Sequence, residues 1–172
     1  MIRDGREDDL PAIVAIYNDA IPGRLATADL EPVTVESRRS WLVDRDDRHP
    51  IWVFERARAV VGWMTLGKFY GRPAYAATVE VSVYVAPGAR GLGIATALMN
   101  HALARAPSLG ISTFLGFVFA HNRPSVALCE KFGFTQWGHL PRVAVLDGVE
   151  RDLLILGKRL DDPRAVSPTS SS

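Results

Sequence analysis

The stretch from Val83 to Thr96, VYVAPGARGLGIAT, constrains the fold more than any other part of the chain. It predicts a strand that turns at a Pro-Gly pair and enters a helix through Arg90, Gly91 and Gly93. Glycines let a bulky group approach the backbone, and the first N–H groups of a helix have no partner inside it. Because the helix dipole also places partial positive charge there, the stretch predicts a phosphate-binding loop, to which Arg90 adds a planar cation.

Three interpretations of this glycine loop are open. A tight strand-to-helix turn would need glycine for its geometry alone. A dinucleotide fingerprint would need glycine at position 96, where the chain has threonine, and the G-K-[ST] of a P-loop does not occur. The third interpretation is a cradle for the pyrophosphate of coenzyme A.

Composition is that of an ordinary single-domain globular protein. Of 172 residues, 48% are hydrophobic and 23% are charged, and the formal net charge of +1 gives no reason to expect a nucleic-acid partner. Without a long apolar run or a visible secretory leader, we expect a cytoplasmic protein with no membrane partner. One cysteine excludes an internal disulfide, and four histidines without ligand spacing lead us to expect no metal site.

Apolar periodicity and turn residues predict an α/β order of elements. Asp8 or Asp9 can cap a first helix that runs through Tyr17, and a second short helix is expected from Thr34 through Leu42. Further helices are expected from the glycine loop to near position 107 and over 122–132. The predicted strands are 49–55, 60–66, 76–85, 111–119, 135–140 and 151–160. Residues 1–160 then form one domain, and the polar tail 161–172 is expected to be disordered.

A second motif, AHNRPSVALCEKFGF, occupies residues 120–134. Asn122 stands at the entrance of the fourth predicted helix, where its amide can cap the helix or bind the amide of a pantetheine arm. Gly133 fits the helix C-cap, with Phe134 as the apolar residue that closes it. Together the two motifs give the order strand, glycine loop, helix, strand, Asn, helix and Gly-Phe. That order favours an acyl-coenzyme A-binding domain over two unrelated turns.

These residues resemble the GNAT family of N-acetyltransferases. Arg90, Gly93 and Ala95 occupy the fixed positions of that family's arginine-or-glutamine, x, x, glycine, x, glycine-or-alanine signature. Five further segments are similar to the phosphinothricin and methionine sulfoximine N-acetyltransferase subgroup, so that the resemblance spans about Ile2 to Leu160. They are IYNDAI (16–21), EPVTVESR (31–38), GWMTL (62–66), RPAY (72–75) and TVEVSVYV (78–85).

The resemblance implies an α/β domain with a mixed central sheet of about six to seven strands flanked by about four helices. It also implies acetyl-CoA as acetyl donor, no metal, and a homodimer. The backbone of Val83–Val85 is expected to pair with the pantetheine arm and to polarise the thioester carbonyl. The cofactor-binding residues implied are Val83, Tyr84, Val85, Arg90, Gly91, Leu92, Gly93, Ile94, Ala95, Thr96, Asn122 and Ser125.

Strand TVEVSVYV supplies the candidate catalytic residue. Alternation places Glu80, Ser82 and Tyr84 on one face and the valines on the other. Alternation alone favours a solvent-facing glutamate, but β-branched neighbours would raise the pKa of its carboxyl, as a general base requires. In the resembled subgroup a glutamate at this T-V-E position is the proposed base, which implies that Glu80 removes the amine proton.

The acceptor site departs from the subgroup pattern. Arg72 and Tyr75 are the substrate-binding candidates, Arg72 as a guanidinium that can hold a carboxylate. Tyr70 and Ala76 stand where further arginines are expected, and Glu150-Arg151 replaces an expected Trp-Leu. Cys129 replaces a tyrosine that acts as the acid in many GNAT enzymes, and we expect this thiol to serve in packing.

The sequence therefore predicts an N-acetyltransferase that acts on the primary amine of a small amino-acid-like acceptor, of the phosphinothricin or methionine sulfoximine type. No activated nucleophile is evident, so we expect direct transfer in a ternary complex. Two alternatives stay open. One is a peptide or protein N-terminal acetyltransferase with an open acceptor groove, and the other is a non-catalytic module that senses acyl-CoA.

Overall fold

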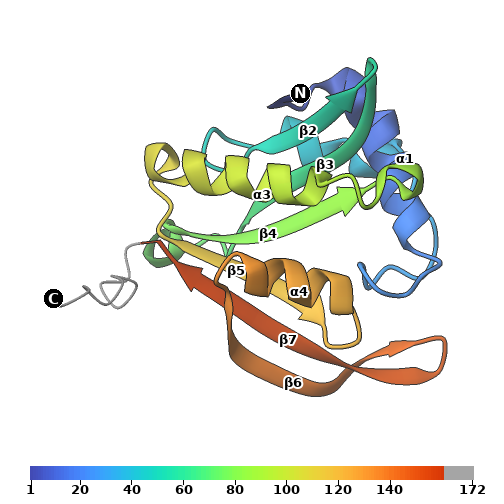
Figure 1. Ribbon diagram of the computed structural model, residues 1–172, viewed down its shortest axis with the longest axis vertical. Coiled ribbons are helices and arrows are strands. Elements are labelled where there is room, and N and C mark those ends of the chain that lie inside the picture. The colour runs from blue at the N-terminus through green and yellow to red at the C-terminus, as the bar shows by residue number, and fades with distance from the viewer. Residues whose placement is uncertain (161–172) are drawn as a thin grey trace, which may run out of the picture.

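A seven-stranded sheet runs through the molecule in the order β1-β2-β3-β4-β5-β7-β6 (Figure 1). The computed structural model describes residues 1–160. The strands are β1 (Ile2–Asp4), β2 (Ile51–Arg56), β3 (Ala59–Lys68), β4 (Thr78–Val85), β5 (Thr113–Phe119), β6 (Thr135–Leu146) and β7 (Val149–Arg159). All neighbouring strands are antiparallel except β4 and β5, which are parallel. This confirms the predicted mixed sheet of six to seven strands.

Four α-helices cover the two faces of the sheet, as predicted. They are α1 (Leu10–Ala20), α2 (Ser40–Val43), α3 (Ile94–Arg105) and α4 (Arg123–Lys131). The side chains of β3 alternate between two hydrophobic clusters, because successive residues of a strand point to opposite faces. Met64 packs in the cluster that contains α3, whereas Trp63 packs in the cluster that contains α1. The two helices therefore lie on opposite faces.

Several element boundaries differ from the predicted ones. Strand β1 was not predicted, because three residues are too few to show a periodicity; it pairs with β2 through Ile2 and Phe54. Strands β6 and β7 extend to a tight turn at Asp147-Gly148, where both residues have positive φ (50° and 78°). That pair is the Asp-Gly signal of a type I′ hairpin, and it defines a longer hairpin than predicted.

The prediction that Asp8 or Asp9 caps α1 is wrong. No side-chain hydrogen bond caps α1 at Asp9. Instead the Asp9 carboxylate accepts hydrogen bonds from the backbone N–H of Arg6 (2.8 Å) and from the guanidinium of Arg3 (2.7 Å). Asp9 stands at the N-cap position of α1, but its carboxylate is turned back to the preceding 3₁₀ turn, Glu7–Asp9, and is occupied there. The tail 161–172 lies outside the described residues.

The sheet opens at its centre, between the two parallel strands. Strand β4 pairs with β5 only from Thr78 to Glu80, opposite Thr113 to Leu115. Beyond this point β4 continues to Val85 and β5 to Phe119, and in the described part of the chain no ladder joins them (Figure 1). One edge of β4 from Val81 to Val85 thus lacks a strand partner, while its other edge stays paired with β3.

Candidate active site

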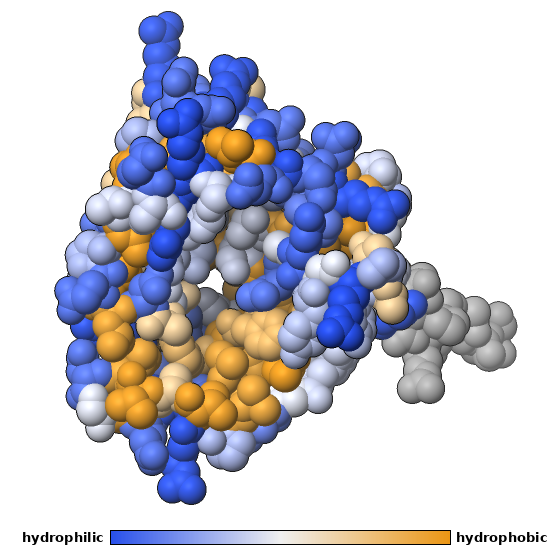
Figure 2. All heavy atoms as spheres, turned by 180° about the vertical axis from the view of Figure 1, so that it is seen from behind, coloured by the Kyte–Doolittle hydropathy of each residue, from blue (hydrophilic) through white to orange (hydrophobic). Residues whose placement is uncertain are grey.

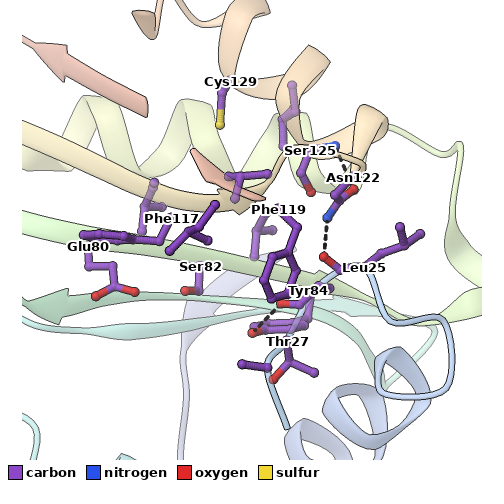
Figure 3. A pocket seen from close by; sticks show the side chains of 18 of the residues that line it. Leu25, Thr27, Glu80, Ser82, Tyr84, Phe117, Phe119, Asn122, Ser125 and Cys129 are labelled. Atoms are coloured by element: carbon purple, nitrogen blue, oxygen red, sulfur yellow. Dashed lines mark hydrogen bonds between the residues drawn. The ribbon is translucent and has the colours of Figure 1, made fainter. Parts of the chain in front are cut away.

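The opening between β4 and β5 holds a cavity of about 510 Å³. Its walls come from three stretches, 25–28 after α1, 80–84 of β4 and 116–119 of β5, together with side chains of α3, α4, β6 and β7. Figure 3 shows Glu80, Ser82 and Tyr84 in a row along β4, with Cys129 on the side of α4. The face seen in Figure 2 is hollowed near its centre, and hydrophobic side chains gather beside the hollow.

Glu80 is the acidic side chain of this cavity. It is partly buried, and among residues 1–160 its carboxylate has neither a hydrogen-bond partner nor an ion-pair partner. Burial raises the pKa of the Glu80 carboxyl above its usual value, which is the direction predicted from its β-branched neighbours. Its cross-strand partner is Gly67, so no side chain from β3 fills the space beside the carboxylate. The Glu80 carboxylate can therefore act as a proton acceptor beside a molecule bound in the cavity.

The entrance of α3 has the features of an anion site. Gly91 and Gly93 have φ values of +75° and +76°, a conformation that other residues rarely adopt. Within residues 1–160 no side chain caps the helix, and a Cβ on either glycine would meet nothing within 4 Å, so the backbone is open to a ligand. Arg90 is exposed beside it. Ile94 is 3% exposed and packs in the core, so of this residue only the backbone can reach a ligand.

Lys131 adds a cation that was not predicted for this entrance. Its Nζ donates a hydrogen bond to Thr96 Oγ1 (3.4 Å), from the last turn of α4 to the first turn of α3. Nothing local in the sequence indicates this contact, because the two residues belong to different motifs. The lysine places positive charge beside the uncapped N–H groups, where the helix dipole also favours an anion.

Asn122 lies at the opposite end of the cavity from Glu80 and is 6% exposed. Its Oδ1 accepts a hydrogen bond from the backbone N–H of Ser125 (3.3 Å), and its Nδ2 donates to the carbonyl of Leu25 (3.1 Å). The capping interpretation is therefore confirmed. Asn122 and Ser125 also line the cavity, as do Val83 and Tyr84 among the other residues predicted to bind a cofactor.

Residues 10–134 match the family described as "Acetyltransferase (GNAT) family". The chain belongs to this family. It is 45% identical over 160 residues to "Putative phosphinothricin acetyltransferase YwnH" of Bacillus subtilis, a match covering 92% of this chain and 98% of that protein. It is 32% identical over 166 residues to the L-methionine sulfoximine/L-methionine sulfone acetyltransferase of Pseudomonas aeruginosa, covering 95% and 96%.

A crystal structure of a GNAT superfamily phosphinothricin acetyltransferase from Sinorhizobium meliloti, in complex with AcCoA, superposes with a TM-score of 0.85. Its sequence identity is 27%, over 99% of this chain and 94% of that chain. The fold and the family predicted from the two motifs are thus confirmed. Among residues 1–160 of this acetyltransferase, no helix is long and apolar enough to cross a membrane, and no cluster of His, Cys, Asp or Glu could hold a metal ion.

The acceptor candidates Arg72 and Tyr75 lie outside the cavity of this acetyltransferase. Both are exposed, and neither lines the space that contains Glu80. A surface 3₁₀ turn, Pro73–Tyr75, holds the segment, and the Tyr75 ring packs 5.3 Å from that of Phe69. The structure therefore does not bring Arg72 together with the candidate base.

Cys129 packs in the core and also lines the cavity, and its expected packing role stays a prediction. It is 5% exposed, belongs to the core cluster of α3, and points toward the cavity from α4 (Figure 3). Burial raises the pKa of its thiol to about 11. The thiol is therefore protonated at neutral pH and is not a thiolate nucleophile.

The loop from Arg24 to Leu30 was missed as part of the site. Its residues 25–28 line the cavity, although they follow α1 and stand far from both motifs in the sequence. His121 Nε2 lies 2.7 Å from the carbonyl oxygen of Arg24, and the Arg24 guanidinium pairs with Asp147 at the β6–β7 turn (2.8 Å). These contacts join positions 97 and 123 residues apart, so no local pattern could reveal them.

Proposed function

We propose that this acetyltransferase transfers the acetyl group of acetyl-CoA to the primary amine of a small amino-acid-like acceptor. The observation that carries the proposal is an unpaired, partly buried Glu80 in a cavity at the β4–β5 opening. Relatives named for phosphinothricin and for methionine sulfoximine or sulfone support an amino-acid-like acceptor. The acetyl-CoA bound in the superposed phosphinothricin acetyltransferase supports the donor.

The residues present fit coenzyme A. The uncapped first turn of α3, at Ile94–Thr96, offers backbone N–H groups to the pyrophosphate, and Arg90 adds charge. The unpaired edge of β4 at Val83–Val85 offers main-chain groups to the amides of the pantetheine arm. The bound donor supplies an activated acetyl thioester.

Glu80 is the proposed general base. Its carboxylate takes one proton from the ammonium of the acceptor, directly or through a water, and leaves the nitrogen lone pair free to attack. The C–N bond forms as the C–S bond of the thioester breaks, and the second proton lost by the nitrogen goes to the departing sulfur, so that coenzyme A leaves as a thiol. A pKa raised by burial makes the carboxylate a stronger proton acceptor than an exposed glutamate. Direct transfer agrees with the protonated state of Cys129, since no other cysteine is present to form an acyl-enzyme.

A Glu80→Gln variant tests this role. We expect kcat/KM at pH 7 to fall by about 10²–10⁴-fold, because the amide cannot accept the proton. The assay follows thiol release from acetyl-CoA with amino acids, sulfoximines, polyamines and short peptides. Glu130→Gln, an exposed change on α4 outside the cavity, is the matched control and should keep wild-type activity. Near-wild-type kcat/KM in Glu80→Gln would refute the role.

The same panel tests the wider proposal. Release with peptides alone would favour an N-terminal acetyltransferase. Tight binding of acetyl-CoA without thiol release from any amine would favour the acyl-CoA-sensing module.

Glu80→Gln should also stabilise the protein at pH 7. Because the folded-state pKa is raised, the folded protein holds the Glu80 proton more tightly than the unfolded chain. Stability is therefore lost as pH rises from the ordinary carboxyl pKa through the raised one, and the amide removes this loss. We expect a higher Tm than wild type at pH 7 and no difference below about pH 4. A lower Tm at pH 7 would contradict the desolvated state of Glu80.

A cytoplasmic homodimer remains part of the proposal. The outermost strand, β6, exposes several apolar side chains, and an exposed apolar strand at a sheet edge favours association. They are Trp137, Leu140, Val143 and Val145. Light scattering on the purified full chain measures the oligomeric state directly.

A further inference from the structure

A second cavity, of about 270 Å³, lies beside the first on the α1 side of the sheet. Ser82 and Tyr84 line both cavities, so the two spaces meet along the polar face of β4. The remaining walls come from α1, α2, β2 and β3. The full lining of this aromatic cavity is Tyr17, Trp41, Ile51, Trp63, Thr65, Ser82 and Tyr84.

Four aromatic rings form a closed circuit in its wall. The Trp63 and Tyr84 rings stack at 4.7 Å, and Trp41 lies 5.5 Å from Trp63. Tyr17 completes the circuit with edge contacts of 5.2 Å to both Trp41 and Tyr84. Each ring thus contacts two others, which holds the wall in one arrangement and gives it apolar, polarisable faces.

The register of β3 and β4 places three successive cross-strand pairs on the face of the sheet that carries Ser82 and Tyr84. Gly67 lies opposite Glu80, Thr65 opposite Ser82, and Trp63 opposite Tyr84. Neighbouring pairs on one face are about 6.7 Å apart, since a strand rises about 3.3 Å per residue. A carboxylate, two hydroxyls and two stacked rings therefore follow one another in a line. An amino acid whose amine lies at Glu80 can direct its side chain along this line to the hydroxyls of Thr65 and Ser82, with the rings beyond them.

No lining residue of the aromatic cavity carries a charge at neutral pH. Burial raises the pKa of both Tyr17 and Tyr84, so their phenols stay protonated. The guanidinium of Arg38 lies over the Trp41 ring at 5.4 Å, does not line the cavity, and is paired with Asp29 at 3.3 Å. In the described part of the chain, neither cavity is lined by a lysine or an arginine.

We propose that the aromatic cavity receives the side chain of the acceptor amino acid and selects neutral side chains over anionic ones. This specificity rests on the proposed N-acetyltransferase function. A sulfone or sulfoximine side chain is neutral, and its oxygens can accept hydrogen bonds from the hydroxyls of Thr65 and Ser82. The phosphinate of phosphinothricin is an anion that would lose its water without gaining a cation, which is unfavourable. The cavity thus separates the two substrate classes for which the relatives are named.

The deciding measurement compares L-methionine sulfone with L-phosphinothricin as acceptors for the purified full chain. We expect kcat/KM to favour the sulfone by about 100-fold or more, as the burial of an uncompensated anion requires. Equal values, or a preference for phosphinothricin, would overturn the neutral selection and leave the N-acetyltransferase function standing. No turnover with either acceptor, together with thiol release from another amino acid of the panel, would overturn the side-chain assignment alone, whereas no release from any amine would overturn the N-acetyltransferase function as well.

Thr65 offers a gain-of-function test. Thr65→Lys introduces a cation into the aromatic cavity, and we expect the ratio of the two kcat/KM values to move toward phosphinothricin by about tenfold or more. Thr65→Val is the matched control; it removes the hydroxyl and adds no charge, so it should lower kcat/KM for the sulfone through the lost hydrogen bond but should not raise kcat/KM for phosphinothricin. An unchanged ratio in folded Thr65→Lys would overturn the proposal.

Trp41 provides an independent test, because it is partly exposed and its loss is tolerated better than that of a core residue. Trp41→Ala should raise KM for methionine sulfone by about tenfold or more and leave KM for acetyl-CoA unchanged. Trp52→Phe, in β2 on the α3 side of the sheet, controls for general loss of stability and should change neither constant. An unaltered acceptor KM in Trp41→Ala would contradict the assignment.

Discussion

Two loops border the ligand-binding region of this acetyltransferase, and they are held in opposite ways. The glycine loop before α3 is exposed and takes its shape from its own residues, Gly91 and Gly93 at positive φ. The 24–30 loop after α1 takes its shape from partners elsewhere in the chain. Asn122 binds its Leu25 carbonyl and Asp147 pairs with its Arg24.

The difference separates two kinds of site. A loop that encodes its own conformation can present backbone N–H groups to a common group such as a pyrophosphate, whatever surrounds it. A loop held by distant side chains depends on the whole tertiary arrangement, and a change in any partner can reshape the cavity it lines. The side proposed for the donor is thus local in origin, and the side proposed for the acceptor is assembled from distant parts of the chain.

The largest expected effect comes from Gly93, which begins α3 in the left-handed conformation. Gly93→Val forces a β-branched residue to φ +76°, which costs about 1–2 kcal/mol of stability. We expect KM for acetyl-CoA to rise by about 10–100-fold, because the loop must change shape. Gly88→Val is the control. A Cβ there also meets nothing within 4 Å, but its φ lies outside the left-handed range. Equal increases in KM for acetyl-CoA at both positions would contradict the role of the left-handed conformation of Gly93.

An intermediate effect is expected at Asn122, which serves both α4 and the 24–30 loop. Asn122→Ala removes the helix cap and leaves the Leu25 carbonyl unpaired, at a cost of about 1–2 kcal/mol. Asn122→Asp keeps an oxygen for the cap but loses the donor to Leu25. Hydrogen exchange should then show α4 protected and residues 24–30 exchanging faster in the Asp variant, and both faster in the Ala variant. Slow hydrogen exchange of residues 24–30 in both variants would contradict the conclusion that the Asn122 side chain holds this loop.

The smallest effect is expected at Arg24, whose ion pair with Asp147 is exposed to solvent. Arg24→Ala should lower Tm slightly at low salt, and the difference from wild type should shrink in about 1 M salt, where charges are screened. Arg142→Ala removes another exposed ion pair of the same hairpin, with Glu150 at 3.9 Å, and serves as the control. If the loss of Tm in Arg24→Ala does not depend on salt, the effect comes instead from the hydrogen bond that Arg24 donates to the Leu30 carbonyl.

The glycine loop and its flanking strand and helix could be predicted because their signals lie next to one another in the chain. The strand ending at Val85, the glycine loop and the helix after it form one continuous segment, and the alternation of β4 places Glu80 on the face opposite the valines. The direction of the Glu80 pKa followed from the same alternation. The role of Arg72 stays a prediction, because a cation in a loop carries no information about which way the loop faces, and Arg72 does not line the cavity that contains Glu80.

The acceptor side could not be predicted from the same patterns. Tyr17 and Trp41 fit the apolar faces of two short helices, and nothing in their spacing indicates a cavity. Trp63 and Tyr84 meet only through the register of β3 and β4. Long-range contacts of this kind are absent from periodicity, since they depend on where packed elements place each side chain.

The sequence by itself determined the α/β order of elements, the family and the position of the glycine loop, because each is written in local backbone preferences and in alternation. The tertiary structure alone decided three other features. It separated β4 from β5, drew the 24–30 loop over the cavity, and joined four rings from α1, α2, β3 and β4 into one uncharged wall. The physical reason is that charge, exposure and enclosure belong to a side chain's surroundings, which only packing creates.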